Sequence, residues 1–135
     1  MPRSILVVDD NRDFAVVLVE LFAEEGYRVR YTFDGRAALW EIERAPPDLV
    51  LADVVMPQVD GMTLVRQLRA RDRTIPVVLM SAIYAHVDVP GVQFLPKPFD
   101  LDYLLQVITR VFDDRAAAEA AGEAPPFRTS ERPRA

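Results

Sequence analysis

The sequence contains no cysteine in its 135 residues. Disulfide bonds and thiolate chemistry are therefore excluded, which makes a cytoplasmic location natural. No apolar run approaches the roughly 20 residues that a membrane-spanning helix needs. The residues that follow Met1 also lack the apolar region of a signal peptide. We therefore expect a cytoplasmic protein that does not contact a membrane.

Basic residues are outnumbered by acidic ones. The chain has 16 lysines and arginines against 21 aspartates and glutamates, which gives a net charge of −5, and Lys97 is its only lysine. Nucleic-acid binding relies on clustered cations, so this balance argues against nucleic acid as the main partner. A small cation or a basic partner fits the charge better.

Half of the residues are hydrophobic, which is enough for one compact domain that buries about two-thirds of its unfolded surface. We expect this domain to span residues 1–113. The tail, residues 114–135, is rich in alanine, proline and arginine. Its first part is expected to prolong the last helix and the remainder to be disordered. A tail of this length has no room for an output domain, so a stand-alone protein is predicted.

The most informative stretch is the apolar run Leu49–Ala52, which follows two prolines and stops at Asp53, four residues before Pro57. A short apolar run between such breaks is typical of a central parallel strand that is buried on both faces. In open α/β sheets, ligands bind at the carboxyl ends of the strands. Asp53 is therefore predicted to lie where chemistry occurs.

Strand and helix patterns alternate along the chain. Strands are expected near residues 5–8, 27–33, 49–53, 76–80 and 92–95, with helices between them and after the last one. Ten residues separate Ser81 from Val92, whereas an average helix takes about eleven, so the fourth helix is predicted to be shortened or missing. The alternation predicts an α/β fold with a doubly wound, five-stranded parallel sheet.

Polar residues follow four of these strands: Asp9 and Asp10, Asp53, Ser81 and Lys97. In a doubly wound sheet these four strands can be neighbours, and their polar ends would then converge. Three close carboxylates repel one another unless a hard divalent cation such as Mg²⁺ is held between them. An ammonium and a hydroxyl suit phosphoryl oxygens. The set predicts a site that can form an aspartyl phosphate.

The motifs at these strand ends resemble those of the receiver domain of two-component response regulators. They are Val-Val-Asp-Asp at 7–10, Asp-Val-Val-Met-Pro at 53–57 with Asp-Gly at 60–61, Ser-Ala at 81–82 and Lys-Pro-Phe at 97–99. The resemblance covers about residues 4–112 and implies the flavodoxin-like receiver fold. It also implies a phosphoprotein of a phosphorelay.

The resemblance assigns a role to each acidic residue. Asp53 would be the phosphoacceptor, supplied by a histidine kinase or a phosphotransfer protein. Asp10 would be a direct Mg²⁺ ligand, with Asp9 acting through water, and the backbone carbonyl of Val55 would be a further ligand. Magnesium is therefore the expected cofactor.

The resemblance also assigns roles to residues of the last two strands. Ser81 and Lys97 would hold the phosphoryl oxygens. Phe94 matches the switch aromatic that packs inward when the serine moves toward the phosphoryl group, and the bond between Lys97 and Pro98 would be cis.

Two apolar residues depart from what efficient hydrolysis requires. Val55 and Ile83 stand two residues after the phosphoacceptor and the serine, at positions that orient water in proteins of this family. Because apolar side chains cannot orient water, slow loss of the phosphoryl group is predicted. The shortened fourth helix would likewise alter the usual output surface of the family.

The first helix is predicted to bury one apolar stripe, which comprises Phe14, Val17, Leu18, Leu21 and Phe22. Ala15, Val16 and Val19 are apolar but fall outside that stripe. They are interpreted as a docking surface for the kinase, and a slightly apolar exposed helix is the alternative. Elsewhere, Trp40 is expected to pack partly against the core, and the arginines at 66, 69, 71 and 73 to form a solvated face.

These observations favour a response regulator that has no separate enzymatic substrate and signals through contacts with an unknown downstream protein. One alternative is a non-phosphorylated interaction scaffold with the same fold, which would be expected to have lost an acid or the lysine. Another is an aspartate-nucleophile phosphohydrolase. That class usually needs a carboxylate where Val55 stands.

Overall fold

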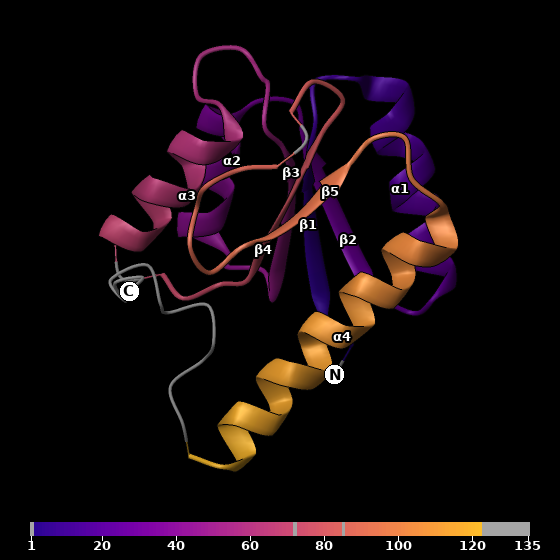
Figure 1. Ribbon diagram of the computed structural model, residues 1–135, viewed down its shortest axis with the longest axis vertical. Coiled ribbons are helices and arrows are strands. Elements are labelled where there is room, and N and C mark those ends of the chain that lie inside the picture. The colour runs from indigo at the N-terminus through magenta and orange to yellow at the C-terminus, as the bar shows by residue number, and fades with distance from the viewer. Residues whose placement is uncertain (1, 72, 85, 123–135) are drawn as a thin grey trace.

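A computed structural model describes residues 2–71, 73–84 and 86–122 (Figure 1). The strands are β1 (Ser4–Val8), β2 (Arg28–Thr32), β3 (Leu49–Asp53), β4 (Val77–Ser81) and β5 (Gln93–Pro96). The helices are α1 (Arg12–Glu24), α2 (Gly35–Arg44), α3 (Gly61–Ala70) and α4 (Leu101–Ala120). All strand pairs are parallel, in the order β2-β1-β3-β4-β5. The predicted α/β fold with a five-stranded parallel sheet is confirmed.

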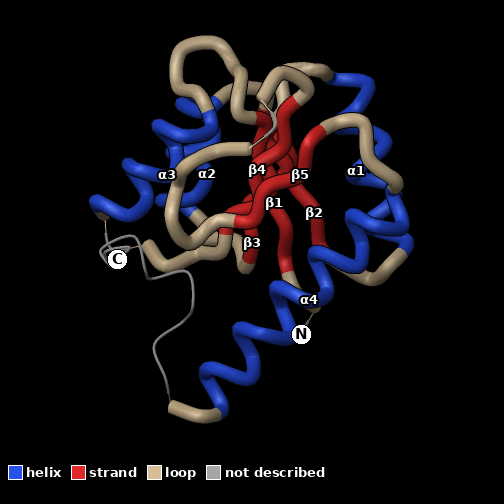
Figure 2. Tube along the Cα trace, in the orientation of Figure 1, coloured by secondary structure: helices blue, strands red, loops and turns tan. Residues whose placement is uncertain are grey.

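Helices cover both faces of the sheet (Figure 2). One face packs against α1 and α4, and the other packs against α2 and α3. Along β3, Leu49 and Leu51 belong to the first of these cores, while Val50 and Ala52 belong to the second. Successive strand residues point to opposite faces, so a strand between two helical layers must be apolar at every position. This explains the continuous apolar run before Asp53.

The buried side of α1 differs from the predicted stripe. Ala15, Leu18 and Phe22 are buried, whereas Val17 is 45% exposed. Positions 15, 18 and 22 lie on one side of a helix because they are three and seven residues apart. The assignment of Ala15 to an outward docking surface is therefore wrong, since its side chain faces the core. Val16 is exposed and Val19 is half-buried.

The described residues between β4 and β5, which are 82–84 and 86–92, form no helix. Three valines of this segment, Val87, Val89 and Val92, pack partly against the core on the α2 and α3 side. The segment therefore covers the edge of that core as an extended loop.

Two features of the C-terminal part bear on the sequence predictions. Helix α4 continues to Ala120. The predicted disorder of the later part of the 114–135 tail stays a prediction, because residues 123–135 lie outside the described part of the chain. Asp100 occupies the N-cap position of α4, but its side chain makes no capping hydrogen bond there.

In the described part of the chain, no helix combines the length and the apolar character that crossing a membrane requires.

The arginines near the end of α3 are more engaged than a solvated face would be. Arg69 donates to the backbone carbonyls of Arg73 and Ile75, at 3.1 and 3.2 Å. Arg71 and Arg73 both pair with Glu43 of α2. Arg71 is exposed, as the predicted solvated face requires. Arg69 and Arg73 are half-buried, so the prediction is wrong for these two residues, which link α3 to its own C-terminal loop and to α2.

Candidate functional site

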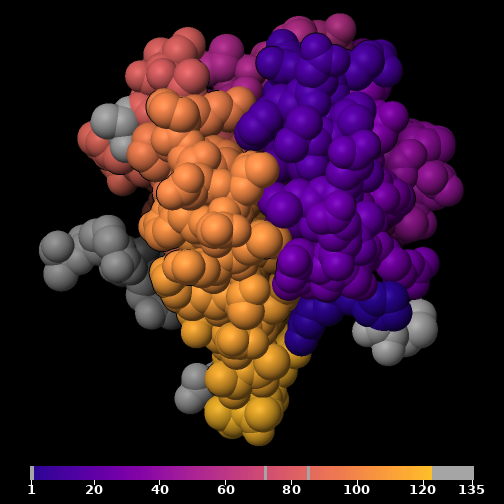
Figure 3. Space-filling model, turned by 90° about the vertical axis from the view of Figure 1, so that its right-hand side faces the viewer, coloured from indigo at the N-terminus to yellow at the C-terminus, as the bar shows by residue number. Residues whose placement is uncertain are grey.

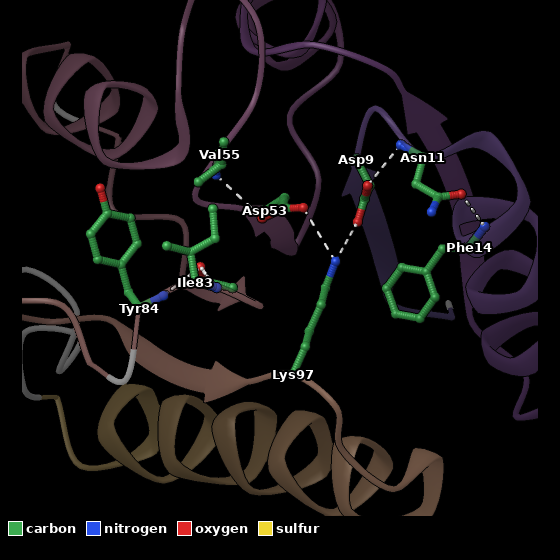
Figure 4. A network of polar contacts seen from close by, with 9 residues as sticks. Asp9, Asn11, Phe14, Asp53, Val55, Ile83, Tyr84 and Lys97 are labelled. Atoms are coloured by element: carbon green, nitrogen blue, oxygen red, sulfur yellow. Dashed lines mark hydrogen bonds and ion pairs between the residues drawn. The ribbon is translucent and has the colours of Figure 1, made fainter.

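The carboxyl ends of β1, β3 and β5 bring three charged side chains together (Figure 4). The Lys97 ammonium lies 3.3 Å from Asp9 Oδ2 and 3.2 Å from Asp53 Oδ2. The strand order reverses between β1 and β3, which is where ligand sites of open α/β sheets lie. The predicted convergence of these residues is therefore present, with the lysine between two carboxylates.

Asp9 is fully buried and holds the turn that follows β1. Its Oδ1 accepts the backbone N–H of Asn11 at 2.9 Å. Asn11 in turn caps α1, because its Oδ1 accepts the N–H of Phe14 at 3.1 Å. Burial raises the pKa of Asp9, an effect only partly offset by the Asn11 hydrogen bond and the Lys97 charge. Asp9 thus serves the local fold as well as the site.

Three carboxylates gather at this edge of the sheet. One oxygen from each of Asp9, Asp10 and Asp53 lies within 4.8 Å of the others. Asp9 is buried, Asp53 is half-buried and Asp10 is exposed. Oxygen ligands at this spacing suit a hard divalent cation such as Mg²⁺. An exposed member leaves the cluster open to solvent, so water molecules could complete such a coordination shell.

The backbone around Asp53 is closely packed. Asp53 Oδ1 accepts the N–H of Val55 at 3.2 Å, and the N–H of Gly61 donates to the carbonyl of Val54 at 2.8 Å. A Cβ atom at Gly61 would lie 2.5 Å from the carbonyl oxygen of Asp53. Only glycine allows α3 to begin this close to the strand end. Gly61 therefore helps to position Asp53, a role that its place in the Asp-Gly motif could have suggested.

Ser81 is almost fully buried at the end of β4. Its hydroxyl oxygen accepts the N–H groups of Ile83 and Tyr84, each at 3.1 Å. The hydroxyl proton remains available for a further acceptor. Ser81 therefore ties the start of the loop between β4 and β5 to the strand end.

Lys97 is oriented by its backbone and by an aromatic ring. Its N–H donates to the carbonyl of Ser81 at 2.7 Å, and its bond to Pro98 is cis, the isomer that the resemblance implied. The ammonium lies 4.6 Å from the ring centroid of Phe14 in α1, a cation–π contact. The sequence prediction placed Phe14 only in the core, although its position in the first turn after the aspartate pair could have indicated the contact. An apolar hollow of about 430 Å³ adjoins the site and is lined by Phe14, Ala82, Lys97, Pro98 and Phe99.

The other predicted residues lie around this centre. Phe94 of β5 is half-buried and packs against the core on the α2 and α3 side. Val55 and Ile83 border the mouth of the site, where they are 44% and 73% exposed. No polar side chain stands at either of these two positions.

The raised pKa of Asp9 predicts a pH-dependent effect of replacing it. The folded protein binds the Asp9 proton more tightly than the unfolded chain, so ionisation of this group costs folding stability. The cost is absent in acid and grows as the pH rises past the ordinary carboxyl range through the raised pKa. We expect Asp9→Asn to increase the free energy of unfolding at neutral pH in the absence of metal, and this gain to shrink as the pH falls.

Urea denaturation across this pH range, with a chelator present, measures the Asp9 effect. Asp10→Asn is the matched control, because Asp10 is exposed and carries the same charge. An increase in the free energy of unfolding that is equal for both variants, or that is independent of pH, would contradict burial of Asp9 as the cause.

Comparisons with known proteins agree with this geometry. A family model described as the response regulator receiver domain matches residues 5–109. The response regulator MprA of Mycolicibacterium vanbaalenii is 37% identical over 131 residues, which cover 90% of this chain and 57% of that protein. MprA of Mycobacterium sp. strain KMS is 39% identical over 111 residues, covering 78% of this chain and 48% of its own length. The chain spans about half the length of these curated relatives.

Two solved structures extend the similarity to three dimensions. The receiver domain of the Francisella response regulator 1452 has a TM-score of 0.72 and 29% identity, and the match covers 80% of this chain and 94% of that one. The signal receiver domain of a histidine kinase from Syntrophus aciditrophicus has a TM-score of 0.69 and 30% identity, with 80% and 88% coverage.

Proposed function

Because the chain belongs to the response regulator receiver domain family of two-component signalling, we propose that it accepts a phosphoryl group on Asp53. The donor is a histidine kinase or a phosphotransfer protein. The observation that carries the proposal is the position of Lys97, whose ammonium lies 3.2 Å from Asp53 in a cluster with two further carboxylates. Signalling through a downstream protein belongs to the same proposal.

The reaction is a nucleophilic transfer. A carboxylate oxygen of Asp53 attacks the phosphorus of a phosphohistidine, so that an O–P bond forms while the P–N bond breaks. The electron pair of the broken bond returns to the imidazole nitrogen of the donor. The product is an aspartyl phosphate on this chain, so the protein is the acceptor of the group and not an enzyme with a separate substrate.

The residues present fit a magnesium ion. The carboxylates of Asp9, Asp10 and Asp53 would hold it, together with the backbone carbonyl of Val55, because all are hard oxygen donors and the three acids are clustered. When bound, Mg²⁺ supplies positive charge that offsets the negative charge of the carboxylates and the phosphoryl oxygens.

Lys97 and Ser81 act on the phosphoryl oxygens. Lys97 contacts the Asp53 carboxylate and needs only a small movement to pair with a phosphoryl oxygen on it. The Ser81 hydroxyl donates a hydrogen bond to another of these oxygens. Because Ser81 also holds Ile83 and Tyr84, its movement shifts the loop after β4, and Phe94 repacks against the core beside it.

Incubation with Mg²⁺ and a small acyl phosphate, followed by peptide mass spectrometry, tests the proposal. We expect one phosphoryl group on the peptide that contains Asp53, and none when Mg²⁺ is chelated. An unmodified Asp53 after incubation with this donor and with candidate kinases would instead favour the interaction scaffold.

The lifetime of the aspartyl phosphate provides a second prediction. Val55 and Ile83 border the site with apolar side chains, so neither orients a water molecule toward the phosphorus. We expect Val55→Asn to shorten the half-life by about tenfold. This is less than the roughly 100-fold or more that a positioned general acid or base supplies, because an amide orients a water molecule without taking its proton. The decay of phosphoprotein, separated on phosphate-affinity gels, measures this, with Val55→Ala as the apolar control. Equal half-lives for Val55→Asn and the wild type would contradict it.

Docking of the kinase concerns the exposed side of α1. Val16 is exposed in the second turn of α1, and the half-buried Val19 lies one turn further along the same helix. We expect Val16→Arg to slow phosphotransfer from the cognate kinase about tenfold while phosphorylation by the small donor stays normal. Ala70→Arg, at an exposed position of α3 on the opposite face of the sheet, is the control. Transfer at the full rate to Val16→Arg would refute docking at this side chain.

A further inference from the structure

Trp40 is the only tryptophan of the chain, and it lies largely outside the core. It is 63% exposed on the outer side of α2, which differs from the packing expected from the sequence. Its ring contacts the guanidinium of Arg44, whose central carbon lies 5.0 Å from the ring centroid. The fold therefore leaves most of a large aromatic surface in contact with solvent, and tryptophan is a residue type enriched at protein interfaces.

Arginines flank Trp40 on the side of β2. Glu41 lies 2.8 Å from Arg30 and 3.1 Å from Arg44, so one carboxylate is shared by two guanidinium groups. Arg36 is exposed one turn before Trp40, on the same side of the helix. It forms no ion pair within the described residues.

The same arrangement recurs on the side of α3. Glu43 lies 3.1 Å from Arg73 and 3.5 Å from Arg71. Two carboxylates thus serve four arginines on this surface, and Arg36 adds a fifth positive charge. We call this surface the Trp40 face; it comprises Arg30, Arg36, Trp40, Arg44, Arg71 and Arg73. Four of its five guanidinium groups pair with Glu41 or Glu43, and Asp48 lines the same hollow as Arg30 and Arg44. A surplus of positive charge remains, and Arg36 is the member without an ion pair within the described residues.

The two layers of helices differ in charge. Helices α1 and α4 together carry seven acidic and three basic side chains. Helices α2 and α3, on the other face of the sheet in Figure 1, carry two acidic and four basic side chains. Figure 3 shows the α1 and α4 side, which is therefore the acidic side of the molecule. The basic surplus around Trp40 is thus a local feature of a protein whose net charge is −5.

We propose that the Trp40 face binds an acidic segment of a partner protein. Carboxylates of this segment pair with Arg36 and the neighbouring guanidinium groups, in the geometry that Glu41 and Glu43 already display, and an apolar part of it covers Trp40. Tryptophan and arginine are the residues most enriched among the energetic centres of protein interfaces. Nucleic acid is disfavoured because the chain as a whole carries a net charge of −5. The interaction goes beyond the phosphorylation of Asp53 and does not depend on it.

Intrinsic fluorescence tests the proposal directly, since Trp40 is the only tryptophan. Titration of the full chain with a short peptide of Glu-Glu-Leu repeats, which offers both carboxylates and apolar side chains, is expected to shift the emission saturably to shorter wavelength. Arg36→Glu is expected to weaken this binding at least about tenfold, because it reverses a charge beside the ring. The variant should fold normally, since an acidic residue in the first turn of a helix is favourable.

Arg110→Glu is the matched control, because it makes the same charge change at an exposed position of α4 on the acidic side. Binding equal to the wild type for Arg110→Glu and weakened for Arg36→Glu would support the proposal. It would be overturned by no saturable shift, by equal effects of the two variants, or by tighter binding of a single-stranded oligonucleotide of the same charge. A shift that depends on protein concentration alone, with dimers in sedimentation, would identify a second copy as the occupant and also overturn it.

Discussion

Asp53→Asn is expected to abolish phosphorylation of the chain. The amide has nearly the same shape as the carboxylate, so its oxygen can still accept the N–H of Val55, and Lys97 keeps its contact with Asp9. An amide oxygen is, however, a far weaker nucleophile than a carboxylate, so the transfer step loses its acceptor. We expect no detectable phosphoryl group at position 53 under conditions that modify the wild type fully, as measured by intact mass.

Two comparisons make the Asp53 result specific. Asp10→Asn should slow phosphorylation at a given Mg²⁺ concentration but retain the site of modification, because it leaves the nucleophile in place. Asp102→Asn, in the exposed first turn of α4, should behave as the wild type. Modification of Asp53→Asn to the wild-type extent would show that another residue accepts the group.

Gly61→Ala is expected to lower the free energy of unfolding by about 1–3 kcal/mol, the usual cost of forcing an extra group into a packed site. The added Cβ would lie 2.5 Å from the carbonyl oxygen of Asp53 and 2.9 Å from the Cα of Val54. Both atoms belong to the backbone, so the clash cannot be relieved by rotating a side chain. Either the start of α3 or the end of β3 must move, and phosphorylation should slow as well because the nucleophile is displaced.

The direction of the Gly61 effect is informative. A glycine-to-alanine change without a clash usually stabilises a protein by about 0.4–1 kcal/mol. The sign of the change in the free energy of unfolding, measured by urea denaturation, therefore distinguishes the two cases. Arg66→Ala, on the exposed side of the same helix, is the control and is expected to fall within about 0.5 kcal/mol of the wild type. A stabilised Gly61→Ala variant would show that the contact with Asp53 is looser than the distances indicate.

Much of the site could be predicted because chain direction and side-chain type suffice for it. A parallel sheet places the carboxyl ends of all its strands at one edge. Residues 9, 53, 81 and 97 each follow an apolar run, so their convergence follows once the strands are recognised. The precise partners do not follow. That Lys97 bridges Asp9 and Asp53 and contacts the ring of Phe14 depends on distances between segments far apart in sequence.

The sides of the helices were predicted less well. In α1, apolar residues occupy so many positions that two stripes are possible, and only packing against the sheet selects the one that buries Ala15 and exposes Val17. The arginines near α3 and the tryptophan of α2 present the same difficulty. Their environment depends on which helix lies beside them, and periodicity within one helix carries no information about its neighbour.

The amino-acid sequence by itself determined the order of strands and helices, the parallel sheet and the identity of the charged residues at its carboxyl edge. These follow from local rules, namely the period of the apolar residues and the breaks between the runs. The tertiary structure alone decided which carboxylates share Lys97, why α3 begins with Gly61, and that Trp40 lies among arginines on an open surface. These depend on contacts between distant segments, where a shift of one side chain by a few ångströms changes its partner.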